Sequence, residues 1–273
     1  MNMAGPETND HLARYSRQIV YGEFGLAGQQ ALAAGKAVII GVGGLGTWLA
    51  EMLARAGVGS LRLVDDDKVD LTNIHRQGLY DESNASAGAT KVQAAAERLQ
   101  RLNAQVSVDP VIARVDRHNI KRIVKDADVI LDGTDNFHTR YLINDVSVKT
   151  SRPWVFAGVI GCQGQTMTIV PGQTPCLRCV LDAAPAPREQ ENARNFGVLG
   201  PVVAAIASIQ ACEAIKILSG KSDRISRRLV KLDLWDNTIQ TIDLAETGPS
   251  PDCTCCGRRV FEYLHPQDHK PKH

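Results

Sequence analysis

The sequence predicts an α/β protein with a doubly wound sheet, parallel in the N-terminal half and continued by antiparallel strands. In the first half, short apolar runs alternate with segments of helical spacing. After Pro153 the pattern changes to consecutive strand-like runs joined by tight turns. Alternating strands and helices are typical of a parallel sheet, whereas strands joined by short turns pair antiparallel. With 273 residues, 44% of them hydrophobic, the chain can bury a substantial core.

The elements of the first half follow from apolar spacing. The run KAVIIG (36–41) ends in glycines, and helical spacing continues over 45–57, which predicts a strand, a tight turn and a helix. The strand pattern returns in SLRLVD (60–65) and DVILDG (128–133), with a helix-like segment at 90–102 between them. This order predicts a βαβ arrangement.

The elements of the second half are hairpins. The runs PWVFAGVIG (153–161) and GQTMTIVPG (164–172) predict two strands joined by a glycine turn, and 228–244 predicts another hairpin about Asp236 and Asn237. The segment 182–197, rich in Pro, Ala and charge, is expected to be a mobile surface loop.

The charge balance excludes several classes of partner. The formal net charge is +1, with 31 basic and 30 acidic residues, so no overall field favours nucleic acid or a membrane surface. The N-terminus carries Asp10, Arg14 and Arg17 and has no apolar run of signal-peptide length, which predicts a cytoplasmic protein. The most apolar stretch, Val202 to Leu218, contains polar and charged side chains and is expected to be a buried helix rather than a membrane span.

A glycine-rich turn predicts a nucleotide site of the Rossmann type. Gly41, Gly43 and Gly46 of GVGGLG stand in G-x-G-x-x-G register between the first strand and its helix. Such glycines let the backbone approach a phosphate at a helix N-terminus. Asp65 ends the next strand, where a carboxylate can accept hydrogen bonds from ribose hydroxyls. Taken alone, this pair indicates a dinucleotide and an oxidoreductase.

The residues after Asp65 favour a triphosphate over NAD. Arginine can fork onto two phosphate oxygens and lysine can act as a point charge, whereas a dehydrogenase needs no such cluster. The polar cluster is formed by Asp67, Thr72, Asn73, Arg76 and Gln77, with Lys91 opening the next helix.

The motif DGTDN adds oxygen ligands after another strand. Asp132, Asp135 and Asn136 suit Mg²⁺ beside a phosphate. The alternative interpretation is that these residues are solvated turn residues and helix caps. Because ligands of α/β proteins bind at the carboxyl ends of strands, the combined set favours a site.

Four of the seven cysteines form two C-x₂-C pairs. Cys176 and Cys179 lie in CLRC, and Cys253 and Cys256 lie in CTCC. Two such pairs supply the four thiolates of a structural zinc site. A redox C-x-x-C and an iron–sulfur cluster are the competing interpretations. Cys255 could replace Cys256 as a ligand, although the spacing favours Cys256.

These motifs together resemble a known family. The blocks RYSRQI, GVGGLG, DDDKVDLTNIHRQ, TDN, CLRC and the closing C-x-x-C occur in the same order as in the ThiF/MoeB/HesA family, the bacterial relatives of ubiquitin-activating enzymes. The likeness runs from about Leu12 to Leu264. It implies a single adenylyltransferase domain over 1–273, with a helical arm (1–35), a nucleotide-binding half (36–150), a carrier-binding half with the zinc site (151–264) and a disordered tail (265–273).

The resemblance implies ATP-dependent adenylylation of the C-terminal Gly-Gly carboxylate of a small ubiquitin-like sulfur carrier, ThiS- or MoaD-like. It places Gly44 against the nucleotide and Asp65 at the ribose. Asn73, Arg76 and Lys91 would hold phosphates. An α-carboxyl has a pKa of about 3.5 and is already a nucleophile at neutral pH, so no general base is required. His75 is accordingly expected to be a surface or packing residue.

The resemblance also assigns a metal and a subunit contact. Asp135 would coordinate Mg²⁺, with Asn136 beside it. Arg17 resembles the arginine that this family inserts into the neighbouring subunit's ATP site, which implies a homodimer. Arg17, Arg76, Lys91 and Asp135 are therefore the expected catalytic residues.

One departure concerns sulfur chemistry. Many family members carry a cysteine in the crossover loop, where this chain has Ala193 beside Arg194. The sequence leaves open whether the reaction ends at the acyl-adenylate or continues through another thiol. Cys162 is the most accessible candidate thiol, although a small turn residue is the favoured interpretation, and Cys212 is expected in the core.

Three alternative functions share some of these motifs. A NAD-dependent oxidoreductase would leave Arg76, Lys91 and Asp135 unexplained. A non-catalytic carrier-binding protein would keep the cysteine pairs but lose the phosphate residues. Adenylation of a tRNA-bound carboxylate is disfavoured because those relatives generally lack paired zinc knuckles. The carrier and its pathway, thiamin, molybdopterin or another, stay open.

Overall fold

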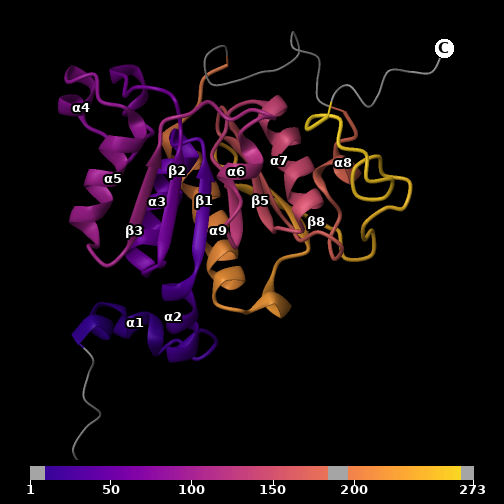
Figure 1. The fold of residues 1–273 in the computed structure, drawn as a ribbon, viewed down its shortest axis with the longest axis horizontal. Helices are drawn as coiled ribbons and strands as arrows, with labels where there is room; N and C mark the ends of the chain where they lie inside the picture. Colours follow the sequence, from indigo (N-terminus) through magenta and orange to yellow (C-terminus); the bar gives the residue numbers. More distant parts are fainter. Residues whose placement is uncertain (1–9, 184–195, 266–273) are drawn as a thin grey trace, which may run out of the picture.

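A computed structural model describes residues 10–183 and 196–265. It contains an eight-stranded sheet in the order β3-β2-β1-β4-β5-β6-β7-β8 (Figure 1). The strands are β1 (Lys36–Ile40), β2 (Ser60–Val64), β3 (Ser107–Val111), β4 (Val129–Asp132), β5 (Trp154–Ile160), β6 (Gln163–Ile169), β7 (Arg228–Asp233) and β8 (Thr238–Asp243).

The sheet changes from parallel to antiparallel at β5. All pairs from β3 to β5 are parallel, and β5–β6, β6–β7 and β7–β8 are antiparallel. The predicted mixed sheet is thus confirmed, including the hairpin whose turn holds Asn237 in the left-handed region, with φ of 53°. β1 lies between β2 and β4, so the direction of winding reverses at β1, which is the point where α/β proteins bind ligands.

Helices cover both faces of the sheet (Figure 1). On one face α3, α5 and α9 pack against alternate strand residues such as Ile39 and Leu131. On the other face α6, α7 and α8 pack with Val38 and Ile130. The helices are α1 (Ser16–Ile19), α2 (Gly25–Ala34), α3 (Gly44–Ala56), α4 (Glu82–Ser86), α5 (Lys91–Leu102), α6 (Ile120–Ile123), α7 (Phe137–Thr150), α8 (Leu177–Val180) and α9 (Gly200–Leu218), with 3₁₀ turns at Asp10–Tyr15, Leu71–Asn73 and Ser222–Arg224.

The glycine turn brings α3 close to the sheet. Gly41 has φ of 86°, a conformation that favours glycine. A Cβ added at Gly46 or at Gly133 would overlap the carbonyl oxygen of Gly41. The turn therefore requires glycine at these positions for packing, before any ligand is considered.

Helix α9 is the one helix of the described chain whose length and composition would suit a membrane span, and half of it is buried. It packs on α3 and on β4, β5 and β6. Inside it, Gln210 donates through Nε2 to the carbonyls of Asp132 (3.1 Å) and Val155 (3.0 Å). These contacts agree with the predicted core helix. Cys212 of the same helix is exposed, however, so its predicted place in the core is wrong, because it lies on the side of α9 turned away from the sheet.

Candidate functional site

A cavity of about 880 Å³ opens at the carboxyl ends of β1, β2 and β4. It is bounded by the glycine turn, by the segment after β2, and by the β4–α7 connection. The residues named from the sequence that line it are Gly41, Gly43, Gly44, Asp65, Asp67, Thr72, Asn73, Arg76, Gln77, Lys91, Asp135 and Asn136.

Asp65 connects the end of β2 to the glycine turn. Its Oδ2 accepts from the backbone N–H of Val42 (2.7 Å), and its Oδ1 accepts from that of Asp67 (2.8 Å). Burial raises the pKa of Asp65, while the nearby Lys91 ammonium opposes that shift. The carboxylate thus fixes the turn and still faces the cavity.

Lys91 enters the cavity from the first turn of α5. Its Nζ lies 2.6 Å from Oδ2 of Asp67 and 3.9 Å from Oδ1 of Asp65. The hydroxyl of Tyr80, which the sequence analysis did not single out, lies 3.1 Å from the carbonyl of Lys91 and 2.8 Å from that of Val42. Tyr80 therefore couples the start of α5 to the glycine turn, and burial raises its pKa well above the ordinary value.

Arg76 is oriented by its own segment. Its Nη2 donates to Oδ1 of Asn73 (2.6 Å), and its Nη1 donates to the carbonyl of Thr72 (3.3 Å). Burial lowers the pKa of Arg76, and the nearby Asp135 carboxylate opposes that shift. His75 is exposed and lies 2.8 Å from Nη1 of Arg76, as expected for a surface residue.

The polar residues Asp135 and Asn136, which follow β4, have different roles. Asp135 is exposed to the cavity and accepts no hydrogen bond from the described residues, which leaves its oxygens available to a cation. Asn136 is the N-cap of α7 and accepts from the N–H of Thr139 (2.9 Å), in line with the helix-cap alternative.

Asp132 is not available as a metal ligand, so that prediction is wrong. It is fully buried and accepts from the N–H and the hydroxyl of Thr134 (2.9 and 2.7 Å). Nε of Arg140 lies 3.3 Å from its Oδ2. The sequence analysis missed Arg140, which lines the cavity from α7. A carboxylate that is buried at the end of a strand needs a neighbouring cation. The position of Asp132 was therefore the one signal in the sequence that could have indicated a buried arginine.

Two residues of the expected site lie outside the cavity. Gly46 is buried under the glycine turn and has a packing role. Arg17 is exposed and belongs to α1. In Figure 1 this helix lies below the sheet, at the end opposite the carboxyl ends of the parallel strands. Within one chain, Arg17 does not reach the nucleotide cavity.

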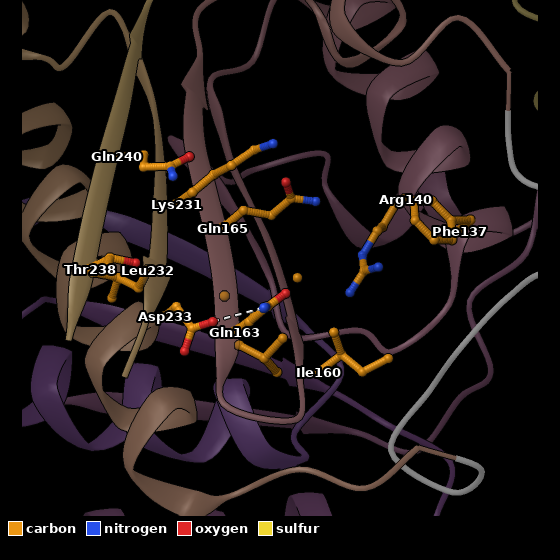
Figure 2. Close-up of a pocket in the computed structure, with 13 residues that line it drawn as sticks. Phe137, Arg140, Ile160, Gln163, Gln165, Lys231, Leu232, Asp233, Thr238 and Gln240 are labelled. Atoms are coloured by element: carbon orange, nitrogen blue, oxygen red, sulfur yellow. Dashed lines mark hydrogen bonds between the residues drawn. The ribbon is translucent and has the colours of Figure 1, made fainter. Parts of the chain in front are cut away.

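A second cavity of about 470 Å³ lies on the sheet face opposite α9 (Figure 2). It is formed by residues of β5, β6, β7 and β8 and by the start of α7. Its polar rim includes the hydrogen bond from Nε2 of Gln163 to Oδ2 of Asp233 (2.8 Å). Arg140 and Val159 line both cavities.

The two cysteine pairs meet in one cluster. Sulfur–sulfur distances are 3.9 Å for Cys176–Cys179, 3.6 Å for Cys176–Cys253 and 3.4 Å for Cys179–Cys256. These distances exceed a disulfide bond of about 2.05 Å. They match the separation of about 3.8 Å between thiolates that surround zinc tetrahedrally at about 2.3 Å. The four residues therefore fit a zinc ion.

Cys255 is not one of these four cysteines, although its side chain lies beside Cys176. Its sulfur accepts from Nδ2 of Asn144 (3.2 Å) and lies 3.5 Å from Oδ1 of Asp145, both on α7. Of the other cysteines, Cys162 lies half-buried in the β5–β6 turn. Ala193 and Arg194, and the loop prediction for most of 182–197, lie outside the described residues.

Comparison with known proteins agrees with this arrangement. The ThiF family model matches residues 15–255. The chain is 39% identical to the sulfur carrier protein ThiS adenylyltransferase of Bacillus subtilis, covering 92% of this chain and 73% of that protein. It is 39% identical to the SAMP-activating enzyme E1 of Haloferax volcanii, covering 94% and 93%.

Longer proteins and solved structures match as well. The chain is 40% identical to the adenylyltransferase and sulfurtransferase MOCS3 of Sus scrofa, of which it spans about half, 54%. A crystal structure of Escherichia coli MccB with MccA-N7isoASN superposes with a TM-score of 0.79 at 25% identity, covering 92% of this chain and 76% of MccB. Because the family model spans most of the chain, including the glycine turn and the polar cluster after Asp65, the chain belongs to the ThiF family.

Proposed function

We propose that this adenylyltransferase uses ATP to adenylylate the C-terminal carboxylate of a small ubiquitin-like sulfur carrier. The observation that carries the proposal is the convergence of the glycine turn, Asp65, Arg76, Lys91 and Asp135 on one cavity. The relatives named for the activation of ThiS and of SAMP support the same reaction.

The carrier's terminal carboxylate attacks the α-phosphate of ATP. A bond forms from a carboxylate oxygen to phosphorus, the bond to the bridging oxygen breaks, and pyrophosphate leaves. The carboxylate is ionised at neutral pH, so the obstacle is bringing an anion onto a polyanion. Fixed cations and in-line positioning overcome that obstacle.

Different residues of the cavity position the nucleotide and neutralise its charge. Asp65 accepts hydrogen bonds from the ribose, and the turn at Gly43 and Gly44 approaches the phosphates. Arg76 and Lys91 neutralise phosphate charge, with Asn73 orienting Arg76. Asp135 would hold Mg²⁺, which supplies further charge neutralisation on the phosphates.

Two further parts of the proposal concern assembly and metal. The enzyme acts as a homodimer in which Arg17 completes the ATP site of the other subunit. The four clustered cysteines hold zinc with a structural role, since four thiolates leave no open position for substrate. The proposal places the enzyme in the cytoplasm, where these thiols stay reduced.

The decisive experiment mixes the protein with ATP, Mg²⁺ and a ThiS-like or a MoaD-like Gly-Gly carrier. We expect the carrier to gain the mass of AMP and pyrophosphate to be released. A carrier ending in a C-terminal amide lacks the nucleophile and is the matched control. Tight NAD binding without any AMP adduct would overturn the proposal in favour of an oxidoreductase.

A further inference from the structure

The nucleotide cavity and the second cavity, which lies on the sheet face formed by β5 to β8, meet at one buried arginine. Arg140 is 6% exposed and lines both, together with Val159 of β5. Figure 2 shows its side chain reaching from α7 toward the β5–β6 pair. An extended chain that passes from the sheet face to the nucleotide at this junction would lie beside this guanidinium.

The guanidinium is held in place from three sides. Its Nε lies 3.3 Å from Oδ2 of Asp132, and its Nη2 donates to the carbonyl of Thr134 (2.8 Å). The rings of Phe137 and Phe156 lie 5.2 and 5.7 Å from its central carbon. Within the described residues, Nη1 takes part in no hydrogen bond. A rigid donor thus remains available at the junction.

Gly158 leaves the space beside that donor open. An added Cβ on this β5 residue would have Nη1 of Arg140 as its nearest neighbour, at 3.6 Å. That separation is an ordinary van der Waals contact, so the strand itself tolerates a methyl group here. The glycine therefore keeps the approach to Nη1 clear rather than meeting a packing need.

The net charge of the Arg140–Asp132 pair determines which kind of hydrogen-bond acceptor in a ligand suits it. Because Asp132 neutralises Arg140, the pair offers an oriented N–H without a free positive charge. Phosphate and carboxylate are better served by Arg76, which is influenced by the exposed carboxylate of Asp135 and forms no ion pair with a carboxylate of the described residues. The neutral, polarised carbonyl of a peptide bond matches a neutral ion pair whose Nη1 group still offers N–H donors.

Resting on the proposed function, we infer that Nη1 of Arg140 donates a hydrogen bond to a backbone carbonyl of the carrier's extended C-terminal tail. This bond positions the tail where it enters the nucleotide cavity. It makes Arg140 a determinant of carrier binding rather than of ATP binding.

The test compares wild type with Arg140→Lys, which keeps a cation beside Asp132 but loses the guanidinium fork. We expect KM for the carrier to rise about threefold to tenfold, the effect of losing one hydrogen bond of ordinary strength. ATP affinity without carrier should stay unchanged. Arg62→Lys is the matched control, because Arg62 pairs with Asp109 at 2.7 Å and lines neither cavity.

A second pair of measurements separates hydrogen bonding from a structural effect. Carriers with a tail amide replaced by an ester have a weaker carbonyl acceptor. At the contacted position the ester should raise KM in wild type and add nothing in Arg140→Lys. Gly158→Ala, which preserves the buried ion pair, should also raise carrier KM and leave ATP affinity unchanged, and it decides the matter if Arg140→Lys does not fold.

The outcomes distinguish two failures. No AMP adduct on any carrier with wild type would overturn the proposed function and this inference with it. Normal adduct formation in wild type, with unchanged carrier KM in folded Arg140→Lys and in Gly158→Ala, would overturn the role of Arg140 alone. A wild-type ester effect that persists fully in Arg140→Lys would do the same.

Discussion

Arg76 and Asp135 approach the nucleotide cavity from different segments and make separate contributions to it. We expect Arg76→Ala and Asp135→Ala each to lower carrier-dependent pyrophosphate exchange by about a hundredfold or more, since each removes charge stabilisation of the transition state. Both variants should keep their circular dichroism spectra. Arg98→Ala, on the exposed side of α5, should keep full exchange. Retained exchange in both cavity variants would contradict the assignment.

The glycine turn gives a prediction about stability. In Gly46→Ala the new methyl group would overlap the carbonyl of Gly41, a backbone atom that cannot move aside without shifting β1 or α3. We expect a loss of about 1–3 kcal/mol or more in the free energy of unfolding, measured by chemical denaturation. Gly22→Ala is the control, because a Cβ there meets nothing within 4 Å. Equal stability of the two variants would show that the turn can relax.

Residues of the site could be predicted where they belong to a recognisable sequence motif and their side chains also suit phosphate or ribose binding. The glycines of the turn and Asp65 stand directly after β1 and β2, so their sequence positions place them near one another. Arg76 and Lys91 lie farther along the chain and were predicted from their phosphate-binding chemistry and from the family resemblance. Asp132 and Arg140 were not predictable in the same way. Whether a carboxylate after a strand faces a ligand or a buried cation depends on which face of α7 packs on β5, and that is a tertiary choice.

At the level of elements, the cysteine cluster ties two segments that are far apart in sequence. Cys256→Ser should lower the zinc content of purified protein and its thermal stability, since structural zinc contributes about 10 kcal/mol or more to folding in small domains. Cys255→Ser should retain zinc, because that sulfur contacts Asn144 instead. Metal analysis by mass spectrometry measures both. Equal zinc in the two variants would overturn the four-cysteine site.

Most elements of the sheet were predictable because their apolar runs end at glycine, proline or asparagine. β3 was not named from the sequence. Its residues SVDPV lie at the edge of the sheet and are mostly exposed, with Pro110 inside the strand. An edge strand needs neither the continuous apolar run nor every backbone N–H, so it gives little signal.

At the scale of the whole molecule, the position of Arg17 gives a prediction about assembly. Arg17→Ala and Arg76→Ala should each be inactive alone, because in the proposed homodimer each site needs both residues from different chains. When subunits of the two variants exchange, mixed dimers contain one intact site, so about a quarter of wild-type activity should return. Adduct formation after mixing measures this. No recovery despite subunit exchange would contradict a shared site.

The switch from parallel to antiparallel pairing at β5 has a consequence for how such an enzyme diversifies. Parallel strands need crossover segments that cover their faces, whereas the antiparallel strand β8 ends the sheet and is exposed along its length. The side chains of β8 are exposed to solvent and are little constrained by packing. Mutations can accumulate on this part of the sheet without disturbing β1, β2 and β4, so recognition of a protein substrate can drift through evolution while the nucleotide chemistry stays constant.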